Sequence, residues 1–407
     1  MRKKNIAIVT LAVALEGEKG YSRFRFLSDM LSEYYHVDLI TSTFQHWEKK
    51  QRDIKDNQNS NNSYRVIFAY EPGYKRNVDI RRVYSHRIAV KNIKKILSKY
   101  SYDLIYCIIP DNQMAAEVGA YAKRNGIKYI VDVEDLWPEA MEMISPLPKR
   151  INRALFDSYR KSAQKAYNCA DAFVGTSDEY RDIPQKKYGI CNKPAITVYV
   201  GCDLDESDAG VREFSNEVVK ENGEFWVTYA GNLGSSYDLI TLIKTAQSLY
   251  EEGYNHIVIK ILGDGPLKSE FEKISEQKPC RVEFLGYMNY RKMAAFLDRS
   301  DILVNSFVKK APQSIVTKIG DYLAAGKPII NTLNSIEFRK KVEADGFGVN
   351  VEPENEDSLL KAIKFIRENK RSSRKMGKNA RMVAEKEFDR KKSYIKIKEL
   401  IEKCFAD

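Results

Sequence analysis

The chain contains 407 residues, 43% of them hydrophobic and 11% aromatic, and its net charge is +11. This length and composition are typical of a globular protein with two domains of ordinary size, and they exclude a disordered chain. The six cysteines form no Cys-x-x-Cys pair and have no close histidine partners. Their spacing argues against a zinc site and a disulfide framework, and favours a reducing compartment.

The positive charge is concentrated in the N-terminal half. Residues 1–200 contain 33 Lys and Arg against 23 Asp and Glu, whereas residues 201–407 contain 34 against 33. The segment 51–100 alone contains 12 against 4. This asymmetry indicates an anionic partner for the N-terminal half, either a membrane surface or a nucleic acid, unless the charges form only a solvated face.

The N-terminal sequence MRKKNIAIVTLAVALEGEKG permits two interpretations. Its basic start and apolar run resemble a secretory signal. The segment 6–10 also predicts the first strand of an α/β sheet, which a glycine loop and an amphipathic helix then follow. We favour the strand, because cleavage would remove the first element of an otherwise unbroken pattern. No apolar run approaches the ~20 residues that are needed to span a bilayer.

Strands and helices alternate along the whole chain, which predicts α/β domains with parallel sheets and right-handed crossovers. Polar residues 48–63 are expected to form a mobile surface loop. The acidic segment 205–224 is interpreted as a linker. In the N-terminal domain, 1–204, the expected strands are 5–10, 37–42, 65–69, 103–109, 128–133, 172–176 and 196–200.

The C-terminal domain is expected to span 225–385, with a final helical segment at 386–407. Its expected strands are 225–230, 257–262, 281–285, 301–306 and 328–331. Its expected helices are 238–252, 266–277, 290–299, 318–324, 335–344, 356–369 and 372–387, and a last helix spans 390–405. Doubly wound domains bind ligands outside the carboxyl ends of their strands.

Three loops follow strands of this second domain: AGNLGSS at 230–236, LGDGP at 262–266 and NSFVKKAPQSIVTK at 305–318. Glycine lets a backbone approach a nucleotide closely, although tight strand-to-helix turns require it as well. Lys318 and Asp321 lie one helical turn apart near a helix start, which favours an anion. A phosphate-bearing ligand and an ordinary capped connection both explain this stretch.

With these loops the chain resembles the nucleotide-sugar glycosyltransferases of family 4, which have the GT-B fold. The resemblance covers nearly the whole chain and rests on YAGNLG, ILGDGP, VEFLGYMNYRKMAAFLDRSDILVNSF and SIVTKIGDYLAAGKPII. The motif DLWPE at 135–139 is similar to the subgroup that makes bacterial capsule, O-antigen and related envelope polysaccharides. The resemblance implies two Rossmann-like doubly wound domains that face each other across a cleft, with the last helix packed back on the N-terminal domain.

The resemblance also implies a donor site. Asp321 falls on the second acid of the family's E-x(7)-E pattern and would hold the ribose hydroxyls, whereas the first acid falls on neutral Gln313. The family's basic diphosphate pair falls on Asn232 and Tyr237, so both charges are missing. The expected donor-binding residues are therefore Gly231, Asn232, Gly234, Tyr237, Gly263, Gly265, Gln313, Ser314, Thr317, Lys318 and Asp321, with Arg23 and Arg25 of the facing domain as further candidates for the diphosphate.

The implied reaction retains the anomeric configuration and requires neither a metal nor a cofactor. Lys318 would stabilise charge on the leaving diphosphate. Asp135 would orient or deprotonate the acceptor hydroxyl, or else it only caps a turn; Glu139 is a weaker candidate. The four histidines show no catalytic constellation. The resemblance favours a UDP-sugar donor that supplies a hexosyl or N-acetylhexosaminyl group, and a polyprenyl-diphosphate-linked glycan acceptor.

Such an acceptor implies a cytoplasmic protein that is attached peripherally to the inner face of the cell membrane. The segment 75–99 has nine Lys or Arg against one acid, Asp79, with Tyr74, Tyr84, Ile88 and Ile93 interleaved. These residues could meet anionic lipid, or the apolar ones could pack on their own domain. Two rival classes are a GT-B-fold sugar-nucleotide epimerase and a nucleic-acid-binding protein, although no nucleic-acid-binding motif is present.

Overall fold

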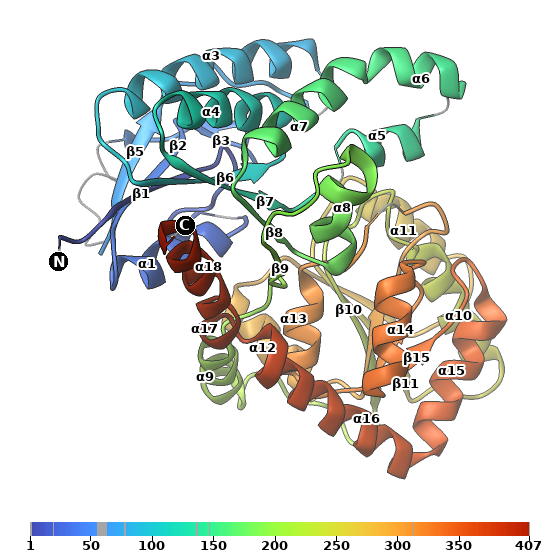
Figure 1. Cartoon of the computed structure of the whole chain (residues 1–407). Helices are drawn as coiled ribbons and strands as arrows, with labels where there is room; N and C mark the ends of the chain where they lie inside the picture. The colour runs from blue at the N-terminus through green and yellow to red at the C-terminus, as the bar shows by residue number, and fades with distance from the viewer. Residues whose placement is uncertain are drawn as a thin grey trace. The chain divides into compact units, whose positions relative to one another are not determined.

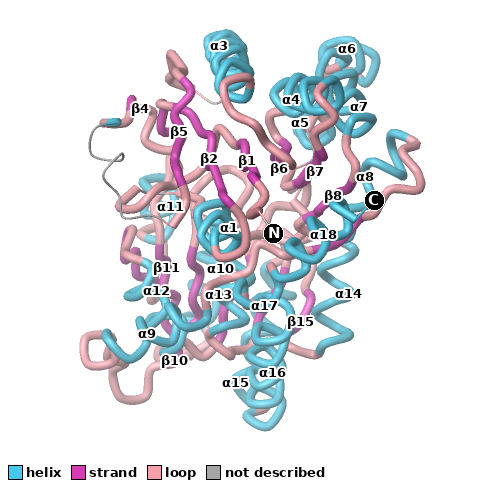
Figure 2. Tube along the Cα trace, turned by 60° about the vertical axis from the view of Figure 1, so that its left-hand side comes forward, coloured by secondary structure: helices cyan, strands magenta, loops and turns pink. Residues whose placement is uncertain are grey.

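The computed structural model describes residues 2–18, 20–54, 63–76, 79–135, 137–145, 147–311 and 313–406. The chain divides into two compact units (Figure 1). Unit 1 comprises Met1–Val198 and Tyr394–Asp407, and unit 2 comprises Tyr199–Ser393. Each unit is built on one parallel β-sheet covered by helices (Figure 2).

Unit 1 contains a seven-stranded parallel sheet in the order β5-β2-β1-β6-β7-β8-β9. Its strands are β1 (Asn5–Val9), β2 (His36–Ser42), β5 (Arg65–Ala69), β6 (Leu104–Ile109), β7 (Lys128–Val133), β8 (Ala172–Gly175) and β9 (Ala195–Thr197). Each strand begins within one residue of its predicted start. Since β1 pairs with both β2 and β6, the interpretation of 6–10 as a strand is confirmed.

The helices of unit 1 cover both faces of this sheet. They are α1 (Arg23–Ser32), α3 (Ile80–Leu97), α4 (Asn112–Arg124), α5 (Glu139–Ile144), α6 (Lys149–Leu155), α7 (Asp157–Cys169), α8 (Asp178–Tyr188) and α18 (Ile395–Ala406). Side chains alternate along β1, so that Ala7 and Val9 pack with α3, α4 and α7, whereas Ile6 and Ile8 pack with α1 and α18. Figure 1 shows α3, α4 and α7 on one face of the sheet and α1 and α18 on the other. The last helix therefore completes the core of unit 1.

Unit 2 contains a six-stranded parallel sheet in the order β12-β11-β10-β13-β14-β15. Its strands are β10 (Phe225–Ala230), β11 (Ile257–Leu262), β12 (Val282–Gly286), β13 (Ile302–Asn305), β14 (Ile329–Asn331) and β15 (Gly348–Asn350). Its helices are α9 (Leu204–Phe214), α10 (Leu239–Glu251), α11 (Lys268–Ser275), α12 (Tyr290–Arg299), α13 (Lys318–Ala324), α14 (Ile336–Asp345), α15 (Glu356–Glu368), α16 (Lys370–Val383), the π-helix η1 (Ala384–Phe388) and α17 (Arg390–Ser393).

The segment 205–224 differs from the expected linker, because its first half forms α9 and belongs to unit 2. The acidic side chains that suggested a solvated linker form ion pairs. The Arg291 guanidinium binds the carboxylates of Glu206 and Glu213, at 2.7 and 2.8 Å. The chain instead passes between the units at 198–199 and 393–394, so the expected last helix divides into α17 and α18.

The expected surface loop 48–63 is also more ordered at its start than its composition suggests. Lys50–Gln51 forms β4, which pairs antiparallel with β3 (Phe44–Gln45). Residues 55–62 of this loop lie outside the described part of the chain. None of the described helices is long and apolar enough to cross a membrane.

Candidate functional site

The candidate site lies at the carboxyl edge of the unit 2 sheet, where loops follow β10, β11 and β13. Strand β10 is flanked by β11 and β13, and the strand order runs in opposite directions from this point. Doubly wound sheets bind ligands at such a switch point, outside the carboxyl ends of the strands. The predicted loops 230–236 and 305–318 leave the sheet on either side of it.

The glycines of the first two loops allow these loops to touch backbone to backbone. Gly231 N donates to Leu262 O at 2.9 Å, and Leu233 N donates to Asp264 O at 3.0 Å. A Cβ on Gly263 would lie 1.8 Å from Gly231 O, and one on Gly265 would lie 2.5 Å from Leu233 O. These glycines are therefore required by the contact between loops, and their contact with a ligand stays a prediction.

The two remaining loop positions of the predicted set, Asn232 and Gly234, lie next to each other. A Cβ on Gly234 would approach Asn232 Oδ1 to 2.7 Å, and the Asn232 side chain is exposed. The Tyr229 hydroxyl donates to Asn232 O at 2.7 Å and so ties the loop to β10.

Lys318 begins α13 and carries a buried ammonium with no hydrogen-bond partner among the residues that the structure describes. Its Nζ lies 4.1 Å from the centre of the Tyr229 ring, 4.5 Å from Tyr237 and 5.1 Å from Phe307. Burial lowers the pKa of Lys318 well below its usual value. The aromatic rings offset part of the cost of burying this cation, but they supply no counter-charge. The arrangement is suited to an anion that approaches Nζ.

Asp321 lies one turn further along α13 and has different neighbours. The Tyr290 hydroxyl, at the start of α12, donates to Asp321 Oδ1 at 2.9 Å. Burial raises the pKa of Asp321 to about 6, against the opposing effects of Tyr290 and Arg390. Cys202 Sγ donates to Gly320 O at 3.3 Å. Lys318 and Asp321 both lie in the first turn of α13, near the helix start as predicted. Each side chain, however, has its own separate set of contacts.

Two further buried acceptors lie at the end of β13 and in the segment between β13 and α13. Gln313 Oε1 and Asn305 Oδ1 have no hydrogen-bond partner in the described ranges. Ser314 is buried, with its Oγ 3.5 Å from Ser335 Oγ, and Thr317 is exposed. An unsatisfied buried polar atom costs ~1–3 kcal/mol, so these two atoms are candidates for contacts that the described residues do not supply.

Sequence reasoning missed a row of amides at this edge. Asn305 Nδ2 donates to Asn331 Oδ1 at 2.8 Å, and Asn331 Nδ2 donates to Asn350 Oδ1 at 2.9 Å. These residues end the three adjacent strands β13, β14 and β15. The sequence does contain a signal for this row, because each of the three strands ends in an asparagine. The row could not be recognised without β15, which was not predicted.

The predicted residues of unit 1 occupy the carboxyl end of β7 and helix α1. Trp137 Nε1 donates to Asp135 Oδ2 at 3.1 Å, and the Tyr188 hydroxyl donates to Glu139 Oε1 at 3.1 Å. Arg25 is partly exposed on α1. Arg23 is fully buried, because its guanidinium binds Asp132 at 2.9 Å inside the unit. A guanidinium held in this way is not available to a ligand.

Glu134 is a functional candidate that the sequence reasoning missed, although it stands directly before the DLWPE motif. It accepts a hydrogen bond from the Tyr21 hydroxyl at 2.9 Å and lies 3.2 Å from Arg23 Nε. Burial raises its pKa to about 8; Arg23 opposes this shift and Asp132 adds to it. A carboxyl group that titrates near neutral pH is suited to proton transfer.

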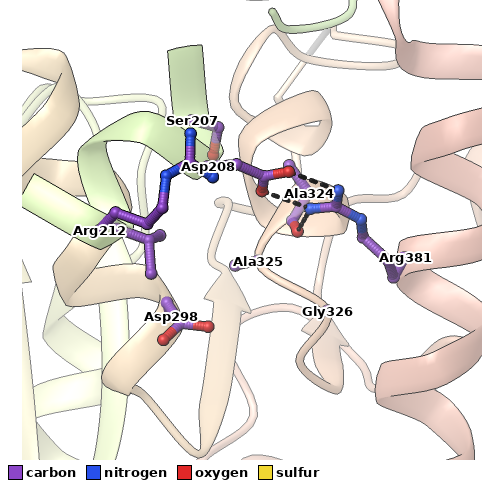
Figure 3. Close-up of a pocket in the computed structure, with 9 residues that line it drawn as sticks. Ser207, Asp208, Arg212, Asp298, Ala324, Ala325, Gly326 and Arg381 are labelled. Carbon is purple, nitrogen blue, oxygen red and sulfur yellow. Dashed lines mark hydrogen bonds and ion pairs between the residues drawn. The ribbon is translucent and has the colours of Figure 1, made fainter. Parts of the chain in front are cut away.

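A pocket of about 330 Å³ lies elsewhere in unit 2 (Figure 3). It is lined by Ser207, Asp208, Val211, Arg212, Asp298, Ala324, Ala325, Gly326 and Arg381. The Arg381 guanidinium binds both carboxylate oxygens of Asp208, at 2.7 and 2.8 Å, and Ala324 O at 3.0 Å. The pocket adjoins the end of α13, opposite Lys318, and its charge pair is already satisfied. It is therefore a weaker candidate than the loops at the carboxyl edge.

Comparisons with known proteins find similarity over the segment that contains these loops. Residues 211–383, which lie in unit 2 and include every predicted donor-binding residue, match the family model described as glycosyl transferases group 1. A search of curated proteins found no match. Across the residues that the structure describes, no group of three His, Cys, Asp or Glu side chains could hold a metal ion.

Solved structures resemble the whole chain. Sucrose-phosphate synthase from Thermosynechococcus elongatus is 17% identical with a TM-score of 0.74, and the alignment covers 99% of this chain and 100% of that one. HepE from Anabaena, in complex with UDP, is 14% identical with a TM-score of 0.68, covering 98% and 100%. WaaG, a glycosyltransferase involved in lipopolysaccharide biosynthesis, is 14% identical with a TM-score of 0.66, covering 96% and 99%. The chain therefore has the GT-B fold with two Rossmann-like domains, and its segment 211–383 is similar to the group 1 glycosyl transferases.

Proposed function

We propose that this protein is a retaining glycosyltransferase that moves a hexosyl or N-acetylhexosaminyl group from a UDP-sugar to a lipid-linked glycan. The observation that carries the proposal is the buried Lys318 ammonium, which has no hydrogen-bond partner among the described residues and stands in the segment that matches the group 1 family. The HepE complexes with UDP and with UDP-glucose support a uridine nucleotide as the donor.

In this proposal Lys318 binds the diphosphate and stabilises the charge that develops as the glycosidic bond breaks. Asp321 accepts hydrogen bonds from the ribose hydroxyls, with Tyr290 holding its carboxylate in place. Gln313 Oε1, which has no hydrogen-bond partner in the described ranges, accepts from a hydroxyl of the donor sugar. No metal or cofactor is invoked, because a lysine can supply the positive charge that the leaving group requires.

The acceptor side is assigned to the end of β7 in unit 1. Asp135 orients or deprotonates the acceptor hydroxyl. The neighbouring Glu134, whose pKa burial raises to about 8, carries a proton in most molecules at neutral pH and can act as a base only in its ionised form.

The exposed face of α3 supports a cytoplasmic protein bound to the inner face of an anionic membrane. Ile80 and Tyr84 are 87% and 63% exposed. The exposed bases Arg81, Arg87, Lys91 and Lys95 lie on the same helix. Of the interleaved apolar residues, Tyr74 and Ile93 are buried in unit 1, as the packing alternative expects. Membrane contact would therefore be made by Ile80 and Tyr84, with basic side chains around them.

The test is a panel of UDP- and GDP-sugars, measured by thermal stabilisation of wild type, Asp321→Ala and Lys318→Ala. A ligand at 100 times its dissociation constant stabilises the folded state by ~2.7 kcal/mol. We expect a UDP-sugar to stabilise wild type and to bind Asp321→Ala at least tenfold more weakly, since a charge-assisted hydrogen bond contributes ~1.5–3 kcal/mol. Equal UDP affinity in folded Asp321→Ala would remove Asp321 from the site.

The two rival functions predict different results for the same protein. An epimerase would convert the donor sugar without any acceptor, and a nucleic-acid-binding protein would bind duplexes with an affinity that falls steeply with salt. Stabilisation by no nucleotide at all would contradict the proposed function.

A further inference from the structure

Helix α6 of unit 1 presents apolar side chains to solvent and not to the core. Ile151 is 52% exposed and Leu155 is 57% exposed. They are one helical turn apart, so their side chains lie on one face of α6. Leu147, just before the helix, is 42% exposed as well. A single exposed apolar residue is ordinary on a protein surface, but three in so short a segment indicate a contact surface.

A polar residue, and not the apolar face, attaches α6 to unit 1. Asn152 is buried, whereas the other six residues of α6 are exposed. The Ser145 hydroxyl donates to Asn152 Oδ1 at 2.8 Å, and Asn152 Nδ2 donates to Leu147 O at 3.1 Å. A surface helix of a globular protein ordinarily turns its apolar side to the core. The apolar side chains of α6 therefore do not serve the packing of unit 1.

Three bases share α6 with these apolar residues. Lys149, Arg150 and Arg153 are exposed, and α6 contains no acid. Because Arg153 follows Lys149 by four residues and Arg150 by three, the three bases lie on one side of the helix. The nearest acids along the chain form ion pairs with bases of α7: Glu142 with Arg160, and Asp157 with Lys161. The helix is thus amphipathic, with a basic side and an apolar side that both face solvent.

This combination identifies the partner by its chemistry. An anionic lipid surface offers phosphate groups to the bases at the headgroup level and an apolar layer to the side chains beneath. A second copy of the chain suits α6 poorly, because a symmetric contact of α6 with itself would bring like charges together. A nucleic acid would bind the bases but would leave Ile151 and Leu155 in water.

Helix α6 belongs to the helical layer that contains α3. It contacts α7, α7 contacts α4, and α4 contacts α3. Figure 1 and Figure 2 both show α3 and α6 at the upper side of unit 1. The apolar face of α6 therefore adds to the layer that also carries the exposed bases of α3.

We propose that α6 inserts Ile151 and Leu155 into the boundary between headgroups and acyl chains of an anionic membrane, with Lys149, Arg150 and Arg153 bound to the lipid phosphates. Helix α6 closely follows the DLWPE motif in the chain, so the membrane would meet unit 1 near the segment assigned to the acceptor. This link to the acceptor rests on the proposed function; the contact with lipid does not.

The test is co-sedimentation of the full chain with vesicles of phosphatidylglycerol and phosphatidylcholine at rising salt. Ile151→Ser/Leu155→Ser, the α6 apolar variant, should bind at least tenfold more weakly and keep the salt dependence of wild type, because it loses inserted side chains and no charge. Lys149→Gln/Arg150→Gln/Arg153→Gln should also bind at least tenfold more weakly at low salt, and its binding should depend less on salt, because screening acts on charges.

Two further variants are the controls. Val219→Ser/Ile336→Ser removes two apolar side chains of unit 2 that are 68% and 72% exposed, and it should bind within threefold of wild type. Ile151→Leu/Leu155→Ile keeps both apolar side chains of α6 and should also bind within threefold. Thermal unfolding of all variants should match wild type, which shows that loss of binding is not loss of folding.

Equal binding by wild type and the α6 apolar variant would overturn the proposal. Equal losses in that variant and in Val219→Ser/Ile336→Ser would overturn it too, since any exposed apolar residue would then suffice. A wild-type dimer that the α6 apolar variant converts to monomers, with vesicle binding unchanged, would show that a second copy covers α6. Stabilisation by UDP is measured separately: its absence in wild type and variant alike would refute the proposed function, while a selective loss of vesicle binding would still support α6.

Discussion

Lys318 combines a position near a helix start, which the sequence shows, with an enclosure of aromatic rings, which only the structure shows. The spacing of Lys318 and Asp321 predicted an anion near the start of a helix. The sequence could not show that Tyr237, which replaces a base in the family pattern, places its ring 4.5 Å from Lys318 Nζ. In the proposed donor site, one lysine in an aromatic enclosure would take the role for which the resembling family uses two bases. Its low pKa is a consequence of that enclosure.

The protonation of Lys318 predicts that UDP binding depends on pH. In the free protein the pKa of Lys318 is lowered by burial, and a bound diphosphate would raise it by favouring the ammonium. Between these two pKa values, binding takes up a proton, so affinity should fall as pH rises. Calorimetry at pH 8 and 9 in buffers of different ionisation enthalpy measures this uptake, since the terminal phosphate of UDP is already ionised there.

Lys318→Met is the control for this pH dependence. It should bind UDP more weakly, and with no proton uptake between pH 8 and 9. Identical proton uptake in wild type and Lys318→Met would assign the effect to another group.

The close contact between the two glycine loops leads to a second prediction, which concerns the stability of the protein. Gly263→Ala places a methyl group against Gly231 O, at a φ of +128°, and should destabilise the protein by ~2–4 kcal/mol. Gly253→Ala is the matched control, because Gly253 has a φ of +84° but no atom within 4 Å of its added Cβ. The control should lose only ~1–2 kcal/mol. Urea unfolding measures both, and equal losses would mean that the two loops can separate without cost.

Elements with clear local signals at their ends were predicted well. The helix predicted at 318–324 is α13 with the same bounds, and every predicted strand of the unit 2 sheet is present. These segments combine apolar runs with glycine or proline at their ends, and both signals are local. Helix α9 was missed because its acids are stabilised by Arg291, 78 residues beyond Glu213. Strand β15 was missed because its three residues (Gly348–Asn350) are identified only by pairing with β14.

Helix α3 carries the prediction for membrane binding. Arg81/Arg87/Lys91/Lys95→Ser removes four exposed charges from this helix. Each base near an anionic surface contributes ~1 kcal/mol, so binding to anionic vesicles should fall at least tenfold. Attachment of wild type should also weaken as salt rises, because exposed charges are screened. Co-sedimentation with anionic and neutral vesicles measures both effects.

A matched control for this experiment exists on unit 2. Arg371/Arg374/Lys375/Lys378→Ser removes four exposed bases from α16 and should leave vesicle binding unchanged. If the two variants lose binding equally, net charge and not α3 governs attachment. If wild type binds no vesicle, the membrane proposal is wrong.

For the whole chain, the sequence predicted the loops of the proposed donor site but not the polar groups that distant segments contribute. Asn305, Asn331 and Asn350 meet only because β13, β14 and β15 are adjacent. Glu134 becomes a titratable candidate because it is buried beside Asp132, and both effects raise its pKa against the opposing effect of Arg23. Local motifs identify residues on one loop. The hydrogen-bond partners and pKa values of those residues depend on burial and on segments that are distant in the sequence.

The most direct measurement is an experimental structure of the protein with UDP. We predict that a diphosphate oxygen lies within hydrogen-bond distance of Lys318 Nζ, at ~2.7–3.0 Å, with the ribose hydroxyls on Asp321. A complex in which UDP binds with Lys318 Nζ still enclosed by Tyr229, Tyr237 and Phe307 and without contact to a phosphate would contradict the proposed donor site.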